Sequence, residues 1–404
     1  MKQYDKEKKK NILYIGDVGQ VGTALTVHAQ NRARLFNSIG YNVSFVCDGG
    51  DNNISPNKYE EFSYTYTKKY IKIPKIRGIE WIVEEIWGPK LFHIVKKQIE
   101  IKKPDLIILY GYSIENKLIK LCNSKKIPLI VERVDWFEKE DRKGFIFKYL
   151  IQRKVDLAIT KNDLKADGII AISEYLFQHY KNNDQLVTWI PPIFSFRNKN
   201  IVRNNNNIIR LVYAGSLGGN KDQIIPIIEA MEIINAKQIR IHLDIVGITL
   251  NQLKLALKDN NLKLRGIKAY GRLSNDKTKE IIECADFSIL LRQNKRYAKA
   301  GFSTKFAESM SLGVPVICTK VGGSDKVITD MKDGVHLLDN NIDTIKDKLN
   351  ELLQMSNDDI FEMKNNAYKT ACKLFLIDNY IDQIKEFIDT ILENVNNKKS
   401  KKDI

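Results

Sequence analysis

The amino-acid sequence predicts an α/β protein with two domains, each built on a parallel sheet covered by helices on both faces. Short runs rich in Val, Ile and Leu alternate with longer segments of helical periodicity in both halves of the chain. Continuous aliphatic runs are typical of strands that are buried on both faces, as in parallel sheets. The length of 404 residues allows two domains, and a hydrophobic fraction of 43% lets each bury a core. The composition therefore excludes a disordered chain.

The expected strands follow one another along both halves of the chain. In the first half they are Asn11–Ile15, Asn42–Cys47, Leu106–Leu109, Pro128–Glu132 and Gly168–Ile172. In the second half they are Arg210–Tyr213, His242–Val246, Lys268–Tyr270, Phe287–Leu291, Val314–Cys318 and Val335–Leu338. Helical patterns separate most of these strands, and parallel strands need such crossover connections.

A tract of prolines and asparagines marks the boundary between the two domains. It runs from Thr188 to Asn207, where two adjacent prolines and a polar Asn tract prevent regular structure. We therefore expect domains over residues 1–192 and 193–376, followed by a closing helix and a basic tail over residues 377–404. That helix is expected to dock on a domain, because one face is apolar and carries Ile381, Ile384, Ile388, Ile391 and Leu392.

The start of the chain and its cysteines indicate a cytoplasmic protein. The charged head MKQYDKEKKK passes directly into a short apolar run, without the apolar core or cleavage site of a signal peptide. The five cysteines form no CxxC pair, which predicts neither a zinc site nor a disulfide framework. Charged residues interrupt the chain too often for a membrane-spanning helix of about 20 apolar residues.

Basic residues exceed acidic ones, and the surplus is concentrated in the first half of the chain. Residues 1–200 carry 34 basic and 23 acidic side chains, out of 65 and 49 in the whole chain. Such a surface can attract nucleic acid, anionic lipid headgroups or a phosphorylated substrate. A genome-wide bias toward Lys, Ile and Asn accounts for the composition equally well. Nucleic acid is not expected as a partner, because no compact basic run occurs outside the termini and no recognised module is present.

The segment Tyr64–Ile99 fits the α/β pattern least well. Among its basic residues it contains the aromatic side chains Tyr64, Tyr66, Tyr70, Trp81, Trp87 and Phe92. Aromatic and basic side chains together favour the headgroup zone of a membrane. A pair of ordinary helices with a buried aromatic face explains the same pattern. Peripheral contact with the anionic inner face of a membrane is therefore one of two open interpretations.

A glycine-bearing loop follows the first strand of the first domain. Gly16, Gly19 and Gly22 let backbone N–H groups approach a ligand, and the next helix presents its positive N-terminus. This geometry suits a phosphate or a sugar. The same glycines, with Asp48 as a ribose partner, also permit an NAD-dependent oxidoreductase. A purely structural role remains open too, because tight turns between a strand and a helix need glycine anyway.

A second glycine-bearing loop follows the first strand of the second domain. Gly215 and Ser216 precede Lys221, which stands at the entrance of a helix. A fixed cation beside free backbone donors is what a diphosphate requires. The spacing differs from the GxxxxGK[ST] pattern, so ATP hydrolysis is disfavoured.

The most specific stretch runs from Ala300 to Cys318. A loop enters a helix whose first turn offers free N–H groups at Ser303 and Thr304, and Glu308 lies about one turn further along. The carboxylate can accept both hydroxyls of a ribose while the amides hold its phosphates. This stretch therefore predicts a nucleotide site.

With these motifs in place, the sequence resembles glycosyltransferases of the large family 4 type. In that family two Rossmann-like domains face each other across a cleft, in the GT-B fold, and the last helix returns toward the first domain. The similarity extends over nearly the whole chain and includes Ile170–Ser173, Tyr270–Leu273 and the pair Gly322 and Gly323. Many members make bacterial capsules, lipopolysaccharide or teichoic acid, so the resemblance implies a role in surface-polysaccharide synthesis.

The resemblance implies roles for the donor-site residues. Lys221 matches the family lysine that neutralises the donor diphosphate. Glu308 matches the second glutamate of a Glu, seven residues, Glu signature, which binds the donor ribose. The amides of Ser303 and Thr304 match the backbone that holds the phosphate, next to Gly215 in the second-domain loop.

Three positions depart from the family pattern in the donor site and in the first domain. The first signature glutamate falls on Ala300, and an arginine that is common in the second-domain loop is replaced by Ser216. Arg292 or Lys305 can supply the missing cation. The first-domain segment that often holds a histidine reads Val131–Asp135.

In the first domain, the resemblance places Gly19 and Gly22 in the loop that faces the reacting sugar. Glu132 or Asp135 is the candidate for the polar role of the missing histidine. His28 lies just after the first loop and has the best claim among the histidines to a role.

The expected activity is that of a hexosyltransferase which moves a sugar from a nucleotide-diphosphate sugar to a glycan or lipid-linked acceptor. Retention of anomeric configuration is inferred from the resemblance. The sequence has neither a DxD triplet nor a tight carboxylate cluster, so metal-independent transfer without a cofactor is expected. Two alternatives remain: a nucleotide-sugar epimerase of the same architecture, and an inactive nucleotide-sugar-binding subunit.

Overall fold

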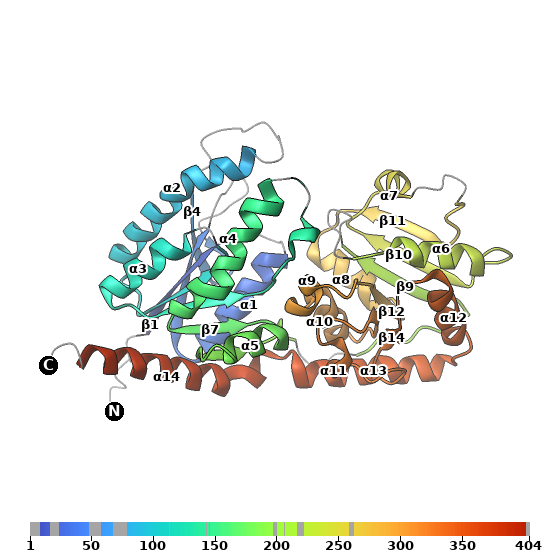
Figure 1. Ribbon diagram of the computed structural model, residues 1–404. Coiled ribbons are helices and arrows are strands. Elements are labelled where there is room, and N and C mark those ends of the chain that lie inside the picture. Colours follow the sequence, from blue (N-terminus) through green and yellow to red (C-terminus); the bar gives the residue numbers. More distant parts are fainter. Residues whose placement is uncertain are drawn as a thin grey trace, which may run out of the picture. The chain divides into compact units, whose positions relative to one another are not determined.

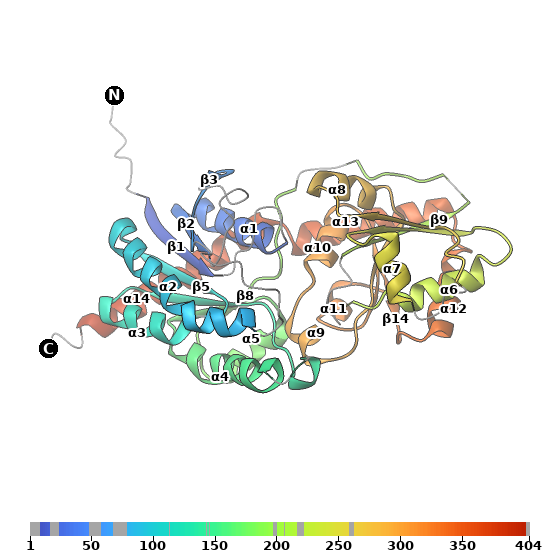
Figure 2. The ribbon, with the colours of Figure 1, turned by 90° about the horizontal axis from the view of Figure 1, so that it is seen from above.

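The computed structural model describes two compact α/β units, each with its own parallel sheet (Figures 1 and 2). Unit 1 comprises the chain up to Pro191 together with the residues from Ile377, and unit 2 comprises Pro192–Leu376. The residues described are 9–16, 24–47, 58–67, 79–112, 114–142, 144, 146–196, 200–205, 207–215, 222–257 and 262–400. Within the helices and strands, the side chains of residues 24, 59, 79–90, 146–147 and 398–400 are outside this description.

The sheet of unit 1 has eight strands among the described residues, in the order β3-β4-β2-β1-β5-β6-β7-β8. All neighbouring strands are parallel except β3 and β4. The strands are β1 (Lys10–Gly16), β2 (Tyr41–Cys47), β3 (Lys58–Tyr59), β4 (Phe62–Tyr66), β5 (Leu106–Tyr110), β6 (Leu129–Arg133), β7 (Gly168–Ala171) and β8 (Val187–Trp189). The central strands β5 and β6 are buried along their whole length, as their aliphatic sequences predict.

Helices cover both faces of this sheet because its connections run in two directions. The chain moves from β1 through α1 to β2 in one direction, and from β4 through α2 to β5 in the other. Right-handed crossovers therefore place α1 and α2 on opposite faces. The helices are α1 (Ala24–Ser38), α2 (Ile79–Lys102), α3 (Glu115–Lys125), η1 (Lys139–Asp141), η2 (Ile146–Ile151), α4 (Gln152–Leu157), η3 (Ala158–Asn162), η4 (Asp163–Lys165), α5 (Glu174–Lys181), η5 (Ile377–Tyr380) and α14 (Ile381–Ser400).

The last helix, α14, completes unit 1 although it follows unit 2 in the sequence (Figure 1). Its apolar stripe, with Ile384, Ile388 and Ile391, is fully buried. Gly168 permits this close packing: a Cβ there would lie 2.5 Å from Ile391 Cδ1 and 2.8 Å from Phe387 Cζ. The closing helix docks on unit 1 as expected, and the lack of a side chain at Gly168 on β7 allows its close approach.

Unit 2 contains a six-stranded parallel sheet among its described residues, in the order β11-β10-β9-β12-β13-β14. The strands are β9 (Ile209–Ala214), β10 (Ile241–Val246), β11 (Ile267–Gly271), β12 (Phe287–Leu290), β13 (Val316–Thr319) and β14 (Val335–Leu337). The helices are α6 (Ile225–Ile234), α7 (Leu250–Ala256), α8 (Asn275–Glu283), α9 (Arg296–Ala300), α10 (Thr304–Ser311), α11 (Ser324–Val327), α12 (Ile342–Leu352) and α13 (Asn357–Leu374). Its largest core cluster joins apolar residues of these strands to α6, α7, α12 and α13.

These sheets confirm the predicted fold class, and each predicted strand has a counterpart. Three short strands were missed: β3, β4, which overlaps the start of the segment that was interpreted as a helix pair or a membrane contact, and β8, which overlaps the start of the predicted boundary tract. Tyr64 of β4 is buried and stacks on Phe45, with 4.9 Å between ring centroids. No helix among the described residues is both long and apolar enough to cross a membrane.

Candidate functional site

Unit 2 has a topological switch point between β9 and β12, where the chain reverses the direction in which it adds strands. In open parallel sheets, ligands bind outside the carboxyl ends of the strands at such a point. Gly215 follows β9 and Arg292 follows β12, so both lie at this edge. The sheet topology therefore places two of the predicted donor-site residues together.

Asp222 joins two predicted cations at this edge. Its carboxylate accepts a hydrogen bond from Arg292 Nε at 2.9 Å and one from Lys305 Nζ at 2.5 Å. Burial alone would raise the pKa of Asp222, but the two cations outweigh this effect and lower it. One carboxylate thus fixes two cations and neutralises only one of them.

Gly215 leaves the space that the Lys305 side chain occupies. A Cβ at this position would lie 2.2 Å from Lys305 Nζ and 2.7 Å from the Tyr213 hydroxyl oxygen. The Lys305 ammonium also lies 4.8 Å from the centroid of the Tyr213 ring. A side chain at this position would therefore displace the Lys305 ammonium or the Tyr213 hydroxyl.

Helix α10 directs its N-terminus into a small pocket of unit 2. Ser303 caps the helix, since its Oγ accepts a hydrogen bond from Phe306 N at 3.4 Å. The first N–H groups of an α-helix have no partner within the helix, which makes this end a site for anions. The pocket is lined by Leu290, Arg292, Ala298, Gly301, Phe302, Ser303, Phe306, Cys318, Thr319, Val321, Gly322 and Ser324.

Glu308 lies on α10 one turn after Thr304, as the sequence predicts. Its side chain is partly buried, and burial raises the pKa of the carboxyl while Lys279 lowers it in part. A buried carboxylate that gains hydrogen bonds from ligand hydroxyls is stabilised in its charged form. Glu308 is therefore suited to accept hydroxyl groups from a ligand held at the same helix.

Ala300 is completely buried at the end of α9. The turn after β13 packs closely against α9, because a Cβ on Gly322 would lie 2.4 Å from the carbonyl oxygen of Ala298. A methyl group thus occupies the position where the resemblance expects a carboxylate.

In unit 1 the corresponding switch point lies between β1 and β5. The two strands end in close contact: a Cβ on Gly16 would lie 1.8 Å from the carbonyl oxygen of Tyr110. Gly16 therefore has a structural reason to be glycine, which is independent of any ligand.

Glu132 is the centre of a buried network under this edge. Its carboxylate accepts hydrogen bonds from Tyr14 Oη at 2.5 Å and Arg32 Nε at 3.0 Å, and lies 2.8 Å from His28 Nε2. Burial would raise the pKa of Glu132, but Arg32 and His28 outweigh it and lower the pKa to about 2. The carboxylate is ionised and holds His28 and Arg32 of α1 against β6.

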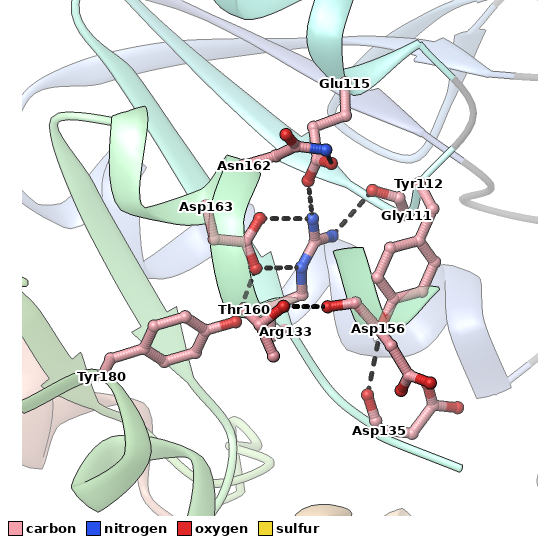
Figure 3. A network of polar contacts seen from close by, with 10 residues as sticks. All are labelled: Gly111, Tyr112, Glu115, Arg133, Asp135, Asp156, Thr160, Asn162, Asp163 and Tyr180. Atoms are coloured by element: carbon pink, nitrogen blue, oxygen red, sulfur yellow. Dashed lines mark hydrogen bonds and ion pairs between the residues drawn. The ribbon is translucent and has the colours of Figure 1, made fainter. Parts of the chain in front are cut away.

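Arg133 forms a second buried network on the opposite face, because successive side chains of a strand point to opposite sides (Figure 3). It donates to Asp163 at 2.6 and 2.8 Å and to the carbonyl oxygen of Gly111 at 2.7 Å, and it pairs with Glu115. Burial and Asp163 raise the pKa of Glu115 to about 8, although Arg133 lowers it. The guanidinium thus joins the end of β6 to the loop after β5 and to η4.

The structure brings together only part of the predicted site. Gly215, Arg292, Ser303 and Lys305 lie together at this edge of unit 2, whereas Thr304 and Glu308 are placed by their positions on α10, which begins there. Gly19, Gly22, Ser216 and Lys221 lie outside the described residues. The backbone oxygen of Asp135 accepts a hydrogen bond from Tyr112 Oη at 3.0 Å.

Asp222 was not predicted. Two cations at the carboxyl edge of one sheet need a counter-ion. Asp222 could have been proposed for this role from the sequence, because it is the acidic residue next to Lys221. The parts of the chain described here contain no cluster of three or more His, Cys, Asp or Glu side chains that could hold a metal ion.

Comparison with known proteins finds a family match in the second half of the chain. Residues 195–373 match the family "Glycosyl transferases group 1". The findings support a glycosyltransferase with the GT-B fold. An uncharacterized glycosyltransferase of Methanocaldococcus jannaschii is 24% identical over 349 residues, which cover 81% of this chain and 84% of that protein.

Solved structures share the fold at low sequence identity. Sucrose-phosphate synthase of Thermosynechococcus elongatus superimposes with a TM-score of 0.75 at 14% identity, over 95% of this chain and 100% of that one. HepE of Anabaena, in complex with UDP and glucose, gives a TM-score of 0.66 at 15% identity, over 94% of this chain and 100% of that one. The chain therefore shares its fold with these solved structures.

Proposed function

We propose that this glycosyltransferase is a hexosyltransferase that transfers a sugar from a nucleotide-diphosphate sugar to a glycan or lipid-linked acceptor, in the synthesis of a surface polysaccharide. The observation that carries the proposal is the meeting of three groups at one edge of unit 2. These are the first turn of α10, the pair Arg292 and Lys305, and the Glu308 carboxylate one turn further along the same helix. The UDP bound to Anabaena HepE supports a nucleotide donor.

Each group is suited to bind one part of such a donor. The first amides of α10 and the two cations suit a diphosphate, which carries negative charge that grows as the sugar leaves. Lys221 is proposed to add a further cation from the loop before Asp222. Glu308 suits the two hydroxyls of a ribose, since a carboxylate accepts two hydrogen bonds. The donor is thus held by charge at one end and by hydroxyl recognition at the other.

The proposed transfer needs no metal at the leaving group, because positioned cations and helix amides stabilise the departing diphosphate. The bond between the anomeric carbon and the diphosphate oxygen breaks as the sugar gains oxocarbenium character. The acceptor hydroxyl oxygen then forms the new bond to the anomeric carbon, and its proton passes to the departing diphosphate. Retention at the anomeric carbon is part of the proposal. Glu132 or Asp135 is proposed for the polar role in unit 1, with Gly19 and Gly22 facing the sugar.

A thermal-shift panel of nucleotide diphosphates and their sugars tests the donor site, because a ligand that binds only the folded state raises the melting temperature. The Glu308→Gln variant should lose most of the shift seen with the wild type. Glu280→Gln is the matched control, since Glu280 is an exposed glutamate on α8 of the same unit. An undiminished shift in Glu308→Gln would place the nucleotide elsewhere.

A second candidate is a nucleotide-sugar-binding subunit without turnover, which the buried methyl group of Ala300 favours. Both candidates bind the donor, so the discriminating measurement is release of nucleotide diphosphate in the presence of a panel of glycan and lipid-linked acceptors. Turnover with any acceptor supports the transferase, whereas binding without turnover across the panel supports the subunit.

A further inference from the structure

We propose that the outer side of residues 149–165 in unit 1 binds a membrane surface that contains anionic lipid. This basic-apolar face consists of Tyr149, Leu150, Arg153, Leu157, Lys161 and Lys165. The proposal rests on the proposed function, because binding to the membrane would bring the protein to a lipid-linked acceptor. Its tests involve no sugar nucleotide, so failure of the donor site and failure of the face are distinguishable.

The face follows from the helical periodicity of η2, α4, η3 and η4. The inner side carries the buried residues Gln152, Val155, Ile159 and Asp163, which recur every three or four residues. The exposed residues recur with the same spacing on the other side. An element with one buried stripe ordinarily presents polar residues to water on its other side.

Here the outer side carries large apolar residues instead. Tyr149 is 43% exposed, Leu150 is 50% exposed and Leu157 is 39% exposed. Single exposed apolar residues are normal on a protein surface, but here three occur within nine residues on the consecutive elements η2 and α4. In Figures 1 and 2, α4 lies on the outside of unit 1.

Three basic residues of this segment lie on its outer side, and its acidic residues are engaged with internal partners. Arg153, Lys161 and Lys165 are exposed, whereas the acidic residues Asp156 and Asp163 are engaged with internal partners. Asp156 Oδ1 accepts hydrogen bonds from Trp136 Nε1 at 2.8 Å and Gln152 Nε2 at 2.9 Å. Asp163 is held by Arg133 and Tyr180. The outward charge of the face is therefore positive.

This combination fits an anionic lipid surface better than it fits water or a purely acidic partner. Basic side chains are attracted to anionic headgroups, and leucine and tyrosine among them enter the boundary between headgroups and acyl chains. At the edge of the face, η1 adds Lys139, whose ammonium lies 4.1 Å from the Tyr149 ring centroid, and the acidic Glu140.

The face is also firmly attached to the sheet. Asp163 and Asn162 bind Arg133 and Glu115 in the buried network at the end of β6 (Figure 3). A surface held by buried ion pairs keeps its shape when it meets a lipid layer. The Tyr64–Ile99 segment, by contrast, has its Tyr64 buried in the sheet, so the described part of β4 offers no comparable patch.

Cosedimentation with lipid vesicles tests the charges. Wild-type full-length protein should bind vesicles of phosphatidylcholine and phosphatidylglycerol at low salt, and much less at high salt or without phosphatidylglycerol. Each cation near the surface contributes about fivefold, so Arg153→Gln, Lys161→Gln and Lys165→Gln together should weaken binding by about 100-fold. The matched control replaces Lys96, Lys97 and Lys102 of α2, which are equally exposed, with glutamine and should change binding little.

A second pair of variants tests the apolar part. Leu150→Ser with Leu157→Ser should weaken vesicle binding by about tenfold, because both leucines would leave the acyl-chain boundary. Leu255→Ser on α7 is the control: Leu255 is 88% exposed, so the substitution removes more exposed apolar surface than at either leucine of the face. It should leave binding unchanged.

Three outcomes overturn the proposal. The first is that the wild type does not bind anionic vesicles. The second is that the triple variant of the face and the triple control variant on α2 lose binding equally, and the third is that the double leucine variant and Leu255→Ser lose binding equally. Thermal unfolding of each variant checks that it folds. If the triple variant is unstable, Lys161→Gln with Lys165→Gln serves instead, with an expected loss of about 25-fold.

Discussion

At the end of β6, two adjacent side chains of opposite charge are buried on opposite faces of the unit 1 sheet. Removing a charge from water is costly, so each persists only with paired partners. Glu132 has Arg32, His28 and Tyr14, and Arg133 has Asp163 and Glu115. The ionic contacts fasten α1 to one face of the sheet and η4 to the other.

Glu132→Gln should destabilise unit 1 in a way that depends on pH. The pKa of Glu132 falls from 4.5 to about 2 on folding, so its charge contributes about 3 kcal/mol of unfolding free energy. A depressed pKa means that this contribution is complete well above pH 4.5 and is lost as the pH falls toward 2. Denaturant unfolding of wild type and variant between pH 7 and pH 3 should show a difference that shrinks in acid. A difference independent of pH would mean that the effect is one of packing alone.

Lys305→Met should weaken binding of a nucleotide diphosphate about 10- to 150-fold, because a hydrogen bond to a charged group contributes about 1.5–3 kcal/mol. The nucleoside without phosphate should bind the variant and the wild type equally. Isothermal titration of both ligands makes the comparison. If the nucleoside loses as much affinity as the diphosphate, Lys305 acts by supporting Asp222 and Tyr213 rather than by meeting phosphate.

At the scale of single elements, the contact between β7 and α14 depends on Gly168. Gly168→Ala should destabilise unit 1 by about 1–3 kcal/mol, since the new Cβ would lie 2.5 Å from Ile391 Cδ1 and the core would have to shift. Ile391→Val removes that same atom. It should cost less in the Gly168→Ala background than in the wild type, and denaturant unfolding of the four proteins measures this coupling. Additive effects would show that the alanine is accommodated elsewhere.

The sequence predicted the buried elements well and the edges poorly. Central strands such as β5 and β6 are unbroken aliphatic runs, and burial on two faces demands such runs. Strand β4 reads FSYTY and β8 has only three residues, so neither carries that signal. Among the site residues, Gly215 and Arg292 follow strands of one parallel sheet, whereas Lys305 was named from the family resemblance as a substitute cation. The partners of Glu132 could not be predicted, because Arg32 is 100 residues away.

At the scale of the whole molecule, the chain leaves unit 1 after Pro191 and returns to it at Ile377. Stopping the chain before Ile381 should therefore unfold unit 1 and spare unit 2. Ile384, Phe387, Ile388 and Ile391 are buried, and each contributes about 1.5–3 kcal/mol, which together is comparable to the stability of a domain.

Hydrogen exchange read by mass spectrometry tests this prediction. Amide protection should be lost in β1 to β8 and retained in β9 to β14. A control that ends after Asn397 keeps the buried stripe and should match the full-length protein. Equal loss of protection in both units would show that they fold as one cooperative body.

The position of α14 also sets an order of events during synthesis. The ribosome releases every strand of unit 1 first, but the helix that covers Gly168 is made after the whole of unit 2. Domains generally fold in the order in which they emerge. Unit 1 is therefore begun first and completed last. The surface of its sheet that binds α14 stays uncovered until synthesis ends, and unit 2 can complete its fold before unit 1.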